Sequence, residues 1–552
     1  MDEEIQKWRS CALLDQKMLA LLNDEKNPIH EYFEGRVAFG TGGMRGLIGP
    51  GPNRINEVTI ARVTAGLGDF LIDEKKVPKE AIKVVIGYDN RYFSRRFAEI
   101  AGAILAAKKI QVFVFEQLTP TPIVSYAIRK MQAQAGIMIT ASHNSKEYNG
   151  YKVYDATGCQ ILPDRVADLN EFAEKYHSSF AFPRSQEEIT WLDEAIEADY
   201  LSEFDSSIKK EKKNLSIGYS PEHGTGGRVV KKLFDRYGFD QVIYPVEQWH
   251  PDPAFSNTKS PNPEVVSSFE LLIHYGKKYK LDLLLATDPD ADRLGAFYRD
   301  HKGEYVRLTG NQIGAILLEY LMEKQTPEEL QNKYIVKTIV SSDLAKKMAQ
   351  SHGCEVVEVL TGFKYIGDTI NKKGADRFLF AYEESFGFLA NPVVRDKDGL
   401  QIALILSEVA NYLKKRGETL GDYLATIYAN YGYFGEEAIS VALTGKEKNV
   451  SENNFYEKLS TKLSKEATIM EDFDLQKRVD LKTGKTTALQ LPQARVRKFY
   501  FEDNNWVCIR PSGTEPKLKI YIGVGTNSLE KTKKTVDTYT KKIATIVEEL
   551  HQ

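Results

Sequence analysis

Val84-Val85-Ile86-Gly87-Tyr88-Asp89 is a short apolar run that ends in a carboxylate, and it is typical of a buried β-strand. An alanine-rich helical segment is predicted over residues 94–108, and Val112-Phe113-Val114-Phe115 is a second run of the strand type. Residues 58–73, which precede the first run, also have a helical pattern. Strands that alternate with helices in this way predict a parallel sheet covered by helices.

Two later stretches repeat this pattern. Leu215-Ser216-Ile217-Gly218-Tyr219-Ser220 echoes residues 84–89. Tyr334-Ile335-Val336-Lys337-Thr338-Ile339-Val340 is a third such strand, and a helical run over residues 343–351 follows it. Three α/β units of roughly one hundred residues or more predict a repeated architecture rather than three unrelated domains.

The ends and junctions of the chain have other patterns. Residues 1–35 are predicted to be largely amphipathic helix, because apolar side chains recur near helical spacing. A charged helical segment near 185–212 separates the first unit from the second. After about residue 433 the β-α-β alternation ends, and a smaller α+β domain is predicted, whose last element is a Lys/Glu-rich helix over 528–549.

The expected fold is therefore α/β, with three related α/β domains that have helix-covered mixed sheets, and a smaller α+β domain at the C-terminus. The expected domains are residues 1–205, 206–312, 313–432 and 433–552.

Composition excludes several functional classes. The chain has 552 residues, 42% of them hydrophobic and 27% charged, which describes an ordinary globular protein of several domains. The net charge is −3, so no global basic field points to nucleic acid or to an anionic membrane. The four cysteines are far apart and form no CxxC pair, which favours a reducing cytoplasm. No signal peptide is predicted at the acidic start, and no apolar run approaches the roughly 20 residues of a membrane span.

Thr140-Ala141-Ser142-His143-Asn144 follows an apolar run over 136–139. The pattern predicts a loop at the carboxyl end of a strand, where ligands gather in open α/β sheets. Ser142, with His143 beside it and Lys152 ten residues on, is laid out like a reactive hydroxyl. Taken alone, however, most loop serines are only turn formers or helix caps.

Asp288-Pro289-Asp290-Ala291-Asp292-Arg293 follows the predicted strand over 281–286. Its three carboxylates repel one another, and a divalent cation is the usual reason for tolerating that repulsion. An EF-hand is excluded, because Arg293 and Arg299 stand where it requires glycine and glutamate. The few ligands suit Mg²⁺, and a solvated acidic turn is the alternative.

Two stretches have the composition of anion sites. Arg510-Pro511-Ser512-Gly513-Thr514-Glu515-Pro516-Lys517 lies between two predicted strands and offers an arginine, two hydroxyls and a glycine backbone, which favours phosphate binding over a plain turn. Gly40-Thr41-Gly42-Gly43-Met44-Arg45-Gly46 lacks the Gly-Lys-Ser/Thr ending of a P-loop. It is either a flexible turn or a backbone that approaches an anion closely, with Arg45 as a clamp.

Two further stretches lie between these motifs. Thr361-Gly362-Phe363-Lys364 precedes Tyr382-Glu383-Glu384-Ser385-Phe386-Gly387, whose carboxylates and serine can bind the vicinal hydroxyls of a sugar. Seen alone, Glu383 and Glu384 are more often a solvated pair. Arg395 and Lys397 are likewise more often surface charge than catalytic.

The motifs at 140–144, 288–293, 383–385 and 510–516 resemble those of the α-D-phosphohexomutase family, in the same order and across nearly the whole chain. Four motifs in order are far more specific than any one of them. The resemblance implies four domains that each give one loop to a central cleft: a phosphoserine loop, a metal loop, a sugar loop and a phosphate loop.

The resemblance also implies the roles of individual residues. Ser142 would carry the phosphoryl group, Mg²⁺ would be bound by that group together with Asp288, Asp290 and Asp292, and Arg293 would contact the group. His143 and Lys152 would be the candidates for proton transfer, with Lys397 also left open. The remaining family positions would bind substrate: Arg45, Thr361, Gly362, Lys364, Glu383, Ser385, Lys397, Arg510, Ser512, Gly513 and Thr514.

Two positions depart from the family pattern. Ser145 stands where proline is common, which gives a second hydroxyl near Ser142, and Phe386 stands where many hexose enzymes carry glycine. Residues 382–400 resemble the branch that contains both bacterial phosphoglucomutases and phosphopentomutases. The arrangement of Glu383 and Ser385 resembles the hexose enzymes, so glucose is the expected sugar.

The expected activity is that of a phosphoglucomutase, with glucose 1,6-bisphosphate as intermediate and activator and with mannose phosphates as further substrates. Phosphopentomutase is the alternative within the same chemistry, and a catalytically silent phosphosugar-binding sensor is the alternative from another class. The expected partner is a small phosphosugar, with no nucleic acid and no membrane, and the sequence leaves the oligomeric state open.

Overall fold

The computed structural model describes residues 2–24, 26–37, 39–40, 43–75, 77–442, 452–511 and 517–551. The chain divides into two compact units. The first unit comprises residues 1–310, 363–378 and 385–420, and the second comprises residues 311–362, 379–384 and 421–552. Each unit therefore contains segments that are distant in sequence, since the chain passes from one unit to the other several times.

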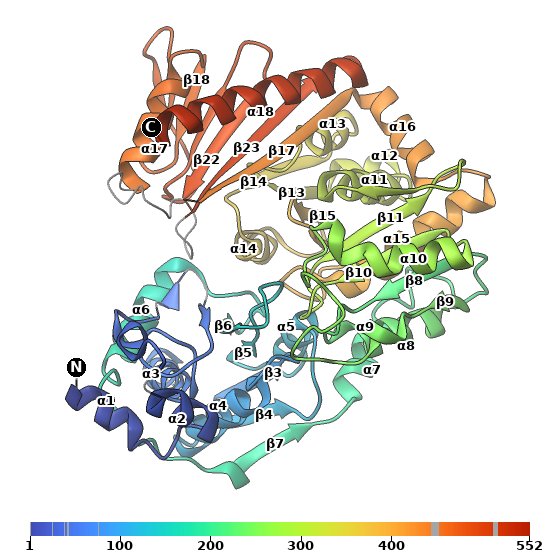
Figure 1. Cartoon of the computed structure of the whole chain (residues 1–552). Helices are drawn as coiled ribbons and strands as arrows, with labels where there is room; N and C mark the ends of the chain where they lie inside the picture. The colour runs from blue at the N-terminus through green and yellow to red at the C-terminus, as the bar shows by residue number, and fades with distance from the viewer. Residues whose placement is uncertain are drawn as a thin grey trace. The chain divides into compact units, whose positions relative to one another are not determined.

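Three parts of the chain share one β-α-β-α-β order, labelled in Figure 1. The first is β3 (Lys83–Tyr88), α4 (Ser94–Ala107), β4 (Gln111–Phe115), α5 (Thr121–Lys130) and β5 (Ala135–Ile139). The second is β8 (Ser216–Ser220), α8 (Gly226–Tyr237), β9 (Gln241–Ile243), α10 (Glu270–Tyr279) and β10 (Leu283–Thr287). The third is β13 (Tyr334–Thr338), α13 (Asp343–Ser351), β14 (Glu355–Val359), α14 (Phe363–Lys373) and β15 (Phe378–Glu383).

The strands of the three repeats lie in the same order within their sheets: β4-β3-β5, β9-β8-β10 and β14-β13-β15. In each repeat the first strand pairs in parallel with the second, and β3 and β8 also pair in parallel with β5 and β10. The repeated architecture predicted from the echoes of residues 84–89 is therefore confirmed.

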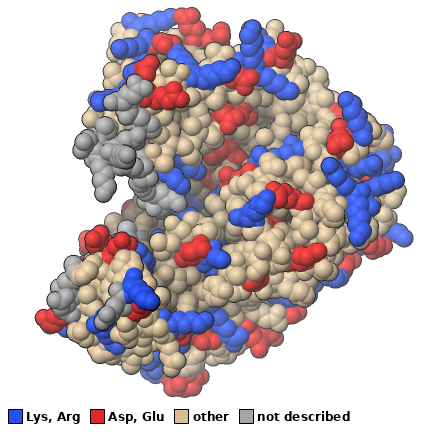
Figure 2. Space-filling model, in the orientation of Figure 1, with Lys and Arg blue, Asp and Glu red and all other residues tan. Residues whose placement is uncertain are grey.

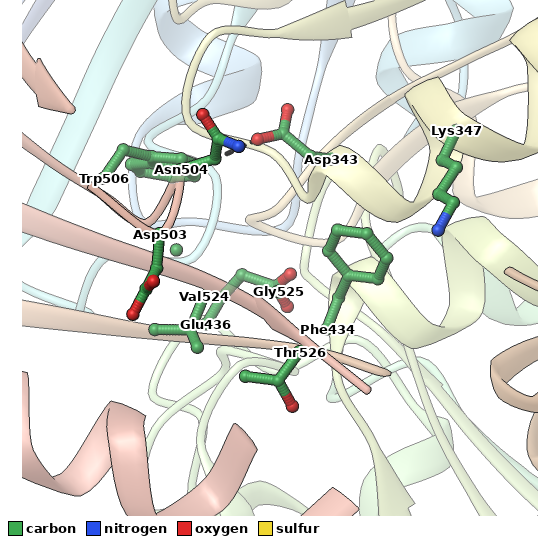
Figure 3. A pocket seen from close by; sticks show the side chains of 11 residues that line it. Asp343, Lys347, Phe434, Glu436, Asp503, Asn504, Trp506, Val524, Gly525 and Thr526 are labelled. Carbon is green, nitrogen blue, oxygen red and sulfur yellow. Dashed lines mark hydrogen bonds between the residues drawn. The ribbon is translucent and has the colours of Figure 1, made fainter. Parts of the chain in front are cut away.

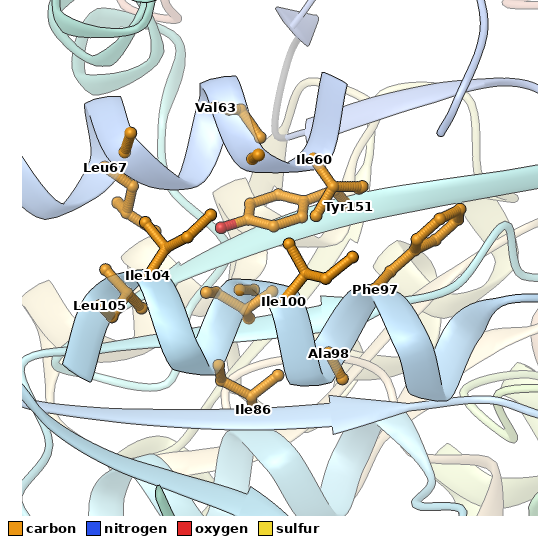
Figure 4. Close-up of a cluster of buried hydrophobic side chains, with 14 of the residues drawn as sticks. Ile60, Val63, Leu67, Ile86, Phe97, Ala98, Ile100, Ile104, Leu105 and Tyr151 are labelled. Atoms are coloured by element: carbon orange, nitrogen blue, oxygen red, sulfur yellow. The ribbon is translucent and has the colours of Figure 1, made fainter. Parts of the chain in front are cut away.

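A large apolar core explains why the first repeat folds as it does. The strand β3 is buried along five of its six residues, and the small and apolar residues of α4 pack over it. Figure 4 shows Ile60 and Val63 of α3 (Glu57–Lys75) above Ile100 and Ile104 of α4, with the ring of Tyr151 between the two helices. Burial of this apolar surface is the main free energy that stabilises the domain.

The first unit contains two mixed sheets. Their orders are β1-β2-β6-β5-β3-β4-β7 and β12-β11-β10-β8-β9, and β6 and β11 run antiparallel to β5 and β10. The other helices and strands of this unit are α1 (Asp2–Arg9), α2 (Gln16–Asn23), η1 (Ile29–Phe33), β1 (Phe39–Gly40), β2 (Gly43–Leu47), η2 (Lys79–Ala81), β6 (Tyr148–Asp155), α6 (Pro163–Glu174), η3 (Gln186–Glu188), β7 (Ile189–Leu192), α7 (Ala195–Ser202), α9 (Val246–Trp249), η4 (Val266–Phe269), β11 (Leu294–Arg299), β12 (Tyr305–Leu308), β16 (Gly387–Leu389) and α15 (Gly399–Lys415).

The second unit contains an antiparallel sheet of order β17-β23-β22-β21-β18-β19-β20. The helix α18 lies along β17 and β23 in Figure 1, and α17 packs against α18 over the same apolar core. The third repeat lies in this unit except for α14, which belongs to the first unit. The other elements are α11 (Gly310–Met322), α12 (Pro327–Gln331), α16 (Leu420–Tyr431), β17 (Tyr433–Ala442), α17 (Glu452–Ser464), β18 (Ile469–Asp472), β19 (Lys477–Asp480), β20 (Thr486–Ala488), β21 (Arg497–Tyr500), β22 (Trp506–Pro511), β23 (Lys517–Thr526) and α18 (Leu529–His551).

Two predictions of secondary structure were wrong. The described residues of the 1–35 stretch form two short helices, α1 and α2, and the 3₁₀ turn η1, because the chain turns after Arg9 and the side chain of Asp15 caps a new helix at α2. Residues 185–212 hold the strand β7, which pairs in parallel with β4, and one short helix, α7. In both places, the elements are shorter than the sequence pattern suggested.

The expected fold class, three related α/β domains and a smaller α+β domain, is confirmed. The domain boundaries and the central cleft stay predictions. Among the described residues, no helix is long and apolar enough to cross a membrane. Figure 2 shows side chains of both charges scattered over the face in view, as the small net charge implies.

Candidate active site

The loop after β5 holds Ser142 in a strained conformation. Its φ angle of 51° lies in the left-handed region, which is uncommon for a residue other than glycine. The backbone N–H of Ser142 donates to the Thr140 hydroxyl at 2.8 Å. The Ser142 hydroxyl donates to Asp288 Oδ2 at 2.7 Å and lies 3.2 Å from His143 Nδ1. The loop therefore places Ser142 against the acidic motif, and its role as the reactive hydroxyl stays a prediction.

Asp288, Asp290 and Asp292 lie in the turn between β10 and β11, and all three are fully buried. One carboxylate oxygen of each lies within 4.8 Å of the others, and no other group of this kind occurs among the described residues. The oxygens of Asp288 accept from Ser142 and from the backbone N–H of Arg293, at 3.0 Å. In contrast, the Oδ1 atoms of Asp290 and Asp292 are buried and accept no hydrogen bond.

Two open, buried carboxylate oxygens beside a third carboxylate suit a divalent cation with oxygen ligands. Burial, reinforced by the charges of Asp290 and Asp292, raises the pKa of Asp288 well above its usual value, and burial with the charge of Asp290 also raises the pKa of Asp292. A bound cation would remove this cost, since it favours the ionised form of every ligand. The chemistry of the residues present therefore fits the expected metal.

Two lysines approach the same carboxylates. Lys152 Nζ lies 2.8 Å from Asp290 Oδ2 and 3.4 Å from Asp292 Oδ2, and Lys397 Nζ lies 2.7 Å from the latter atom. Burial lowers the pKa of Lys152, but the charges of Asp290 and Asp292 outweigh burial and leave this pKa above its usual value. Lys152 is therefore a cation at this site.

The interpretation of Arg395 and Lys397 as surface charge was wrong. The Lys397 side chain is only 13% exposed, and Arg395 is buried. The segment leads directly into α15, where the Asp398 side chain caps the helix by accepting from the backbone N–H groups of Leu400 and Gln401.

Arg293 and Arg45 have protein partners in this structure. Arg293 donates to Glu264, with which it forms an ion pair, and to the backbone carbonyl of Ser385 at 3.0 Å. Arg45 donates to the side-chain oxygen of Asn144 at 3.0 Å. The contact of Arg293 with a phosphoryl group stays a prediction, as does the substrate contact of Arg45.

The second unit brings together four of the expected substrate residues in two pairs. Arg510 of β22 donates to the Thr361 hydroxyl, and the backbone N–H of Gly362 donates to Glu383 Oε1 at 2.9 Å. Glu383 is buried, so its interpretation as half of a solvated pair was wrong. Arg510 Nε is buried and makes no hydrogen bond. Residues 512–514, which include the expected Ser512, Gly513 and Thr514, lie outside the described residues.

None of the contacts described above involves Lys364. It is buried in the first unit, its backbone carbonyl accepts from Cys159 Sγ at 3.3 Å, and burial lowers its pKa to about 8. Its role as a substrate residue stays a prediction.

The three chemical motifs occupy equivalent places in the three repeats. Ser142 follows β5, Asp288 follows β10, and Glu383 ends β15, and each of these strands is the third of its repeat. The repeat therefore positions one functional loop three times, at the carboxyl end of the same strand.

A separate cavity of about 270 Å³ lies in the second unit (Figure 3). Phe434, Glu436 and Trp506 line it together with Asp343, whose carboxylate accepts from the Trp506 indole N–H at 2.9 Å. No residue predicted for the site lines this cavity.

Four domain profiles of one family match the chain in sequence order. They are phosphoglucomutase/phosphomannomutase α/β/α domains I, II and III, over residues 36–179, 198–303 and 309–431, and the C-terminal domain of the same family, over residues 460–537. The chain belongs to the phosphoglucomutase/phosphomannomutase family. The resemblance noted from the motifs, and with it the expected enzyme class of a phosphohexomutase, are confirmed.

Individual relatives of this family are similar over nearly the whole chain. A phosphoglucomutase of Staphylococcus haemolyticus is 36% identical over 92% of this chain and 94% of its own length. The crystal structure of pp63/parafusin, a phosphoglucomutase from Paramecium, in its open form, has a TM-score of 0.69 at 19% identity, over 94% of this chain and 95% of that one. N-acetylphosphoglucosamine mutase of Aspergillus fumigatus, in complex with GlcNAc-6P and magnesium, has a TM-score of 0.52 at 13% identity, over 94% of this chain and 96% of that one.

Several residues at the site of this phosphohexomutase were missed by the sequence argument. Thr121 donates to Asp290 Oδ2 at 2.8 Å, Glu264 pairs with Arg293, and Tyr154 donates to Asp396 Oδ2 at 2.9 Å. Arg91 donates to carbonyls of the Ser142 loop. Only Arg91 had a signal comparable to the motifs, since it lies just after the buried strand β3, as Ser142 lies after β5.

Proposed function

We propose that this member of the family is a phosphoglucomutase that interconverts glucose 1-phosphate and glucose 6-phosphate through a phosphoserine at Ser142. The observation that carries the proposal is the contact of the Ser142 hydroxyl with Asp288, in a buried cluster whose Asp290 and Asp292 each keep an open oxygen. The name of the similar Staphylococcus protein supports glucose as the sugar.

We propose Mg²⁺ as the cation of this site, held by Asp288, Asp290 and Asp292 with an oxygen of the phosphoryl group on Ser142. When bound, it would neutralise charge on the phosphoryl oxygens during transfer. The magnesium in the similar fungal mutase supports this choice. Lys152 and Lys397, which already contact Asp290 and Asp292, would add positive charge on the same side.

His143 is the proposed proton-transfer group for the serine oxygen. Its Nδ1 lies 3.2 Å from Ser142 Oγ, within reach of the proton that this oxygen gains when it gives up the phosphoryl group. The charges of Asp290 and Asp292 raise the pKa of Lys152, so Lys152 would act mainly through its positive charge. Phosphoryl transfer depends more on positioning and charge than on covalent help from the protein.

The remaining residues would bind the sugar phosphate. Glu383 and Ser385 are proposed for the sugar hydroxyls, and Arg510, with Ser512, Gly513 and Thr514, for the phosphate that does not react. Arg45, Thr361, Gly362 and Lys364 complete the proposed substrate set. Glucose 1,6-bisphosphate would form when phosphorylated Ser142 transfers its phosphoryl group to the sugar phosphate. The bisphosphate would then reorient and return its other phosphoryl group to Ser142.

The cellular setting and the domain boundaries also belong to the proposal. We propose a cytoplasmic enzyme, which is supported by four free cysteines that are all buried. The boundaries near residues 205, 312 and 432 are kept as proposed.

The activity is tested by a coupled assay that compares glucose, mannose and ribose 1-phosphates with Mg²⁺ and glucose 1,6-bisphosphate present. The expected result is turnover of glucose 1-phosphate at least about tenfold faster than that of ribose 1-phosphate. Peptide mass spectrometry of the isolated protein should find a phosphate on the Ser142 peptide, which added sugar phosphate discharges.

Ser142→Ala should remove both the phosphate and turnover, by about 10⁴-fold or more, whereas Ser145→Ala should keep both. If Ser145→Ala is the variant that loses the phosphate, the assignment of the nucleophile is wrong. Preference for ribose 1-phosphate would make the chain a phosphopentomutase. Binding of sugar phosphate with no turnover at all would favour the alternative of a catalytically silent phosphosugar-binding sensor.

A further inference from the structure

Arg91 is a buried arginine whose terminal nitrogens donate to four backbone carbonyls at or near Ser142. It lies between β3 and α4 and is 3% exposed. One terminal nitrogen donates to the carbonyls of Ser145, at 2.7 Å, and Tyr148, at 3.0 Å. The other donates to the carbonyl of Ser142, at 2.6 Å, and to that of Asn144.

The guanidinium also forms an ion pair with a buried carboxylate. Arg91 Nε lies 3.2 Å from Asp89 Oδ2, and both side chains are fully buried. Both terminal nitrogens of Arg91 are therefore engaged by protein carbonyls, whereas its Nε forms an ion pair but no hydrogen bond. The guanidinium cannot bind a substrate phosphate without releasing the loop, which distinguishes it from the phosphate-binding arginine expected at position 510.

Three of the four carbonyls belong to the loop that carries Ser142, and the fourth, that of Tyr148, is at the start of β6. Ser142 has a φ angle of 51°, a conformation that persists only where the surroundings impose it. Arg91 holds the carbonyl of Ser142, while Asp288 accepts from its hydroxyl. The backbone and the side chain of the same residue are thus held from two sides, by β3–α4 and by β10–β11.

The guanidinium is also supported by the second repeat of the chain. It lies over the ring of Phe255, 5.1 Å from the ring centroid. Beside it, the Asn90 amide donates to the carbonyl of Asp252 at 2.9 Å. The position of Arg91 is therefore fixed both by the connection between β3 and α4 and by contacts with residues 252–255.

We propose that Arg91 is a positioning residue of the phosphoryl transfer, which holds the Ser142 loop in its strained conformation and turns four carbonyl dipoles away from the phosphoryl group. This inference rests on the proposed phosphoserine at Ser142. Carbonyl oxygens near a phosphoryl dianion would repel it, and their capture by a guanidinium removes that repulsion and adds a fixed positive charge. A shift of the loop by about 1 Å would cost roughly 100-fold in rate.

The test is Arg91→Lys, which keeps the positive charge beside Asp89 but offers three donors in a different geometry. Single-turnover transfer from phosphorylated protein to glucose 1-phosphate should have a limiting rate about 100-fold lower, at a half-saturating concentration within about threefold of the wild type. Amide hydrogen exchange of residues 140–150 should become about tenfold faster. Arg95→Lys is the matched control, because Arg95 lies on α4, pairs with Glu99 and is 60% exposed.

A folded Arg91→Lys protein with wild-type transfer and wild-type exchange would overturn the inference, even if its melting temperature fell, because Arg91 would then be only a structural brace. If Arg91→Lys does not fold, Phe255→Leu decides. It removes the ring under the guanidinium and should lower the limiting rate by about 3- to 10-fold, and an unchanged rate would overturn the inference. If the wild type itself carries no phosphate on Ser142, the proposed function fails, while the exchange measurement still tests the hold of Arg91 on the loop.

Discussion

Single residues show where this protein tolerates an unfavourable conformation or charge. Ser142 has positive φ, and three aspartates share one buried turn. Both features have compensating partners, Arg91 for the serine loop and the lysines 152 and 397 for the carboxylates. Such departures from local preference are expected at functional sites, since elsewhere nothing would offset their cost.

Glu222 is a buried carboxyl that should make stability depend on pH. It lies between β8 and α8, and burial raises its pKa to about 8, an effect that the Thr258 hydroxyl offsets only in part. The folded state therefore keeps a proton that the unfolded state releases above about pH 4.5. The contribution of Glu222 to the free energy of unfolding is fully present below about pH 4.5 and is lost as the pH rises toward 8.

Glu222→Gln should consequently raise the free energy of unfolding relative to the wild type, by little at pH 5 and by on the order of 3 kcal/mol at pH 7. Urea unfolding at pH 5, 6, 7 and 8 measures this difference. Glu171→Gln, on the exposed side of α6, is the control and should give a difference that does not change with pH. A pH-independent difference for Glu222→Gln would contradict a neutral carboxyl at this position.

At the scale of elements, the repeated β-α-β order decides the position of the site. The patterns of residues 84–89 and 94–108 were sufficient to predict β3 and α4, because buried apolar strands and alanine-rich helices have distinct local signals. The error over residues 1–35 arose because a helix boundary depends on a cap and a turn, here at Asp15, more than on apolar spacing.

The close approach of α3 and α6 should depend on one glycine. A Cβ atom at Gly66 would lie 2.5 Å from the Cα of Ala173, so Gly66→Ala must push the helices apart. We expect a loss of about 1–3 kcal/mol in unfolding free energy, against a gain in helix propensity of about 1 kcal/mol.

Gly68→Ala is the matched change in the same helix. There the added Cβ would meet the Cδ atom of Lys108, at 2.6 Å, which belongs to a flexible side chain. Stability should stay the same or rise by up to about 1 kcal/mol. Denaturant titration of both variants tests this, and equal stability of the two would show that the helices do not approach as closely as the structure indicates.

At the scale of the whole molecule, the chain builds two units from interleaved segments, yet the C-terminal part has a core of its own. The apolar core of the antiparallel sheet lies entirely between Val441 and Ile543. Other contacts tie this part to the third repeat, since Lys498 donates to the carbonyl of Ile339 at 2.7 Å and Trp506 donates to Asp343.

A fragment of residues 433–552 should therefore fold alone, with a cooperative thermal transition and dispersed amide resonances. It should be less stable than the same sheet in the full chain by roughly 1–3 kcal/mol, because the buried lysine and the indole lose their partners. Hydrogen exchange of β21 and β22 in both proteins measures the difference. A fragment without cooperative unfolding would move the proposed boundary away from residue 433.

The sequence by itself determined the family and the repeated α/β architecture, and it singled out Ser142, Asp288, Asp290 and Asp292 as candidates for the site. Each of these depends on local signals: apolar periodicity for the strands, and runs of polar residues directly after them. Only the tertiary structure decided that Glu383 is buried and that the Lys397 side chain is only 13% exposed. It also decided that Arg91, Glu264 and Thr121 lie beside the predicted site residues. The contacts of Glu264 with Arg293, of Arg91 with Ser142 and of Thr121 with Asp290 join residues that are 29, 51 and 169 positions apart. Tertiary packing, which no local pattern encodes, brings them together.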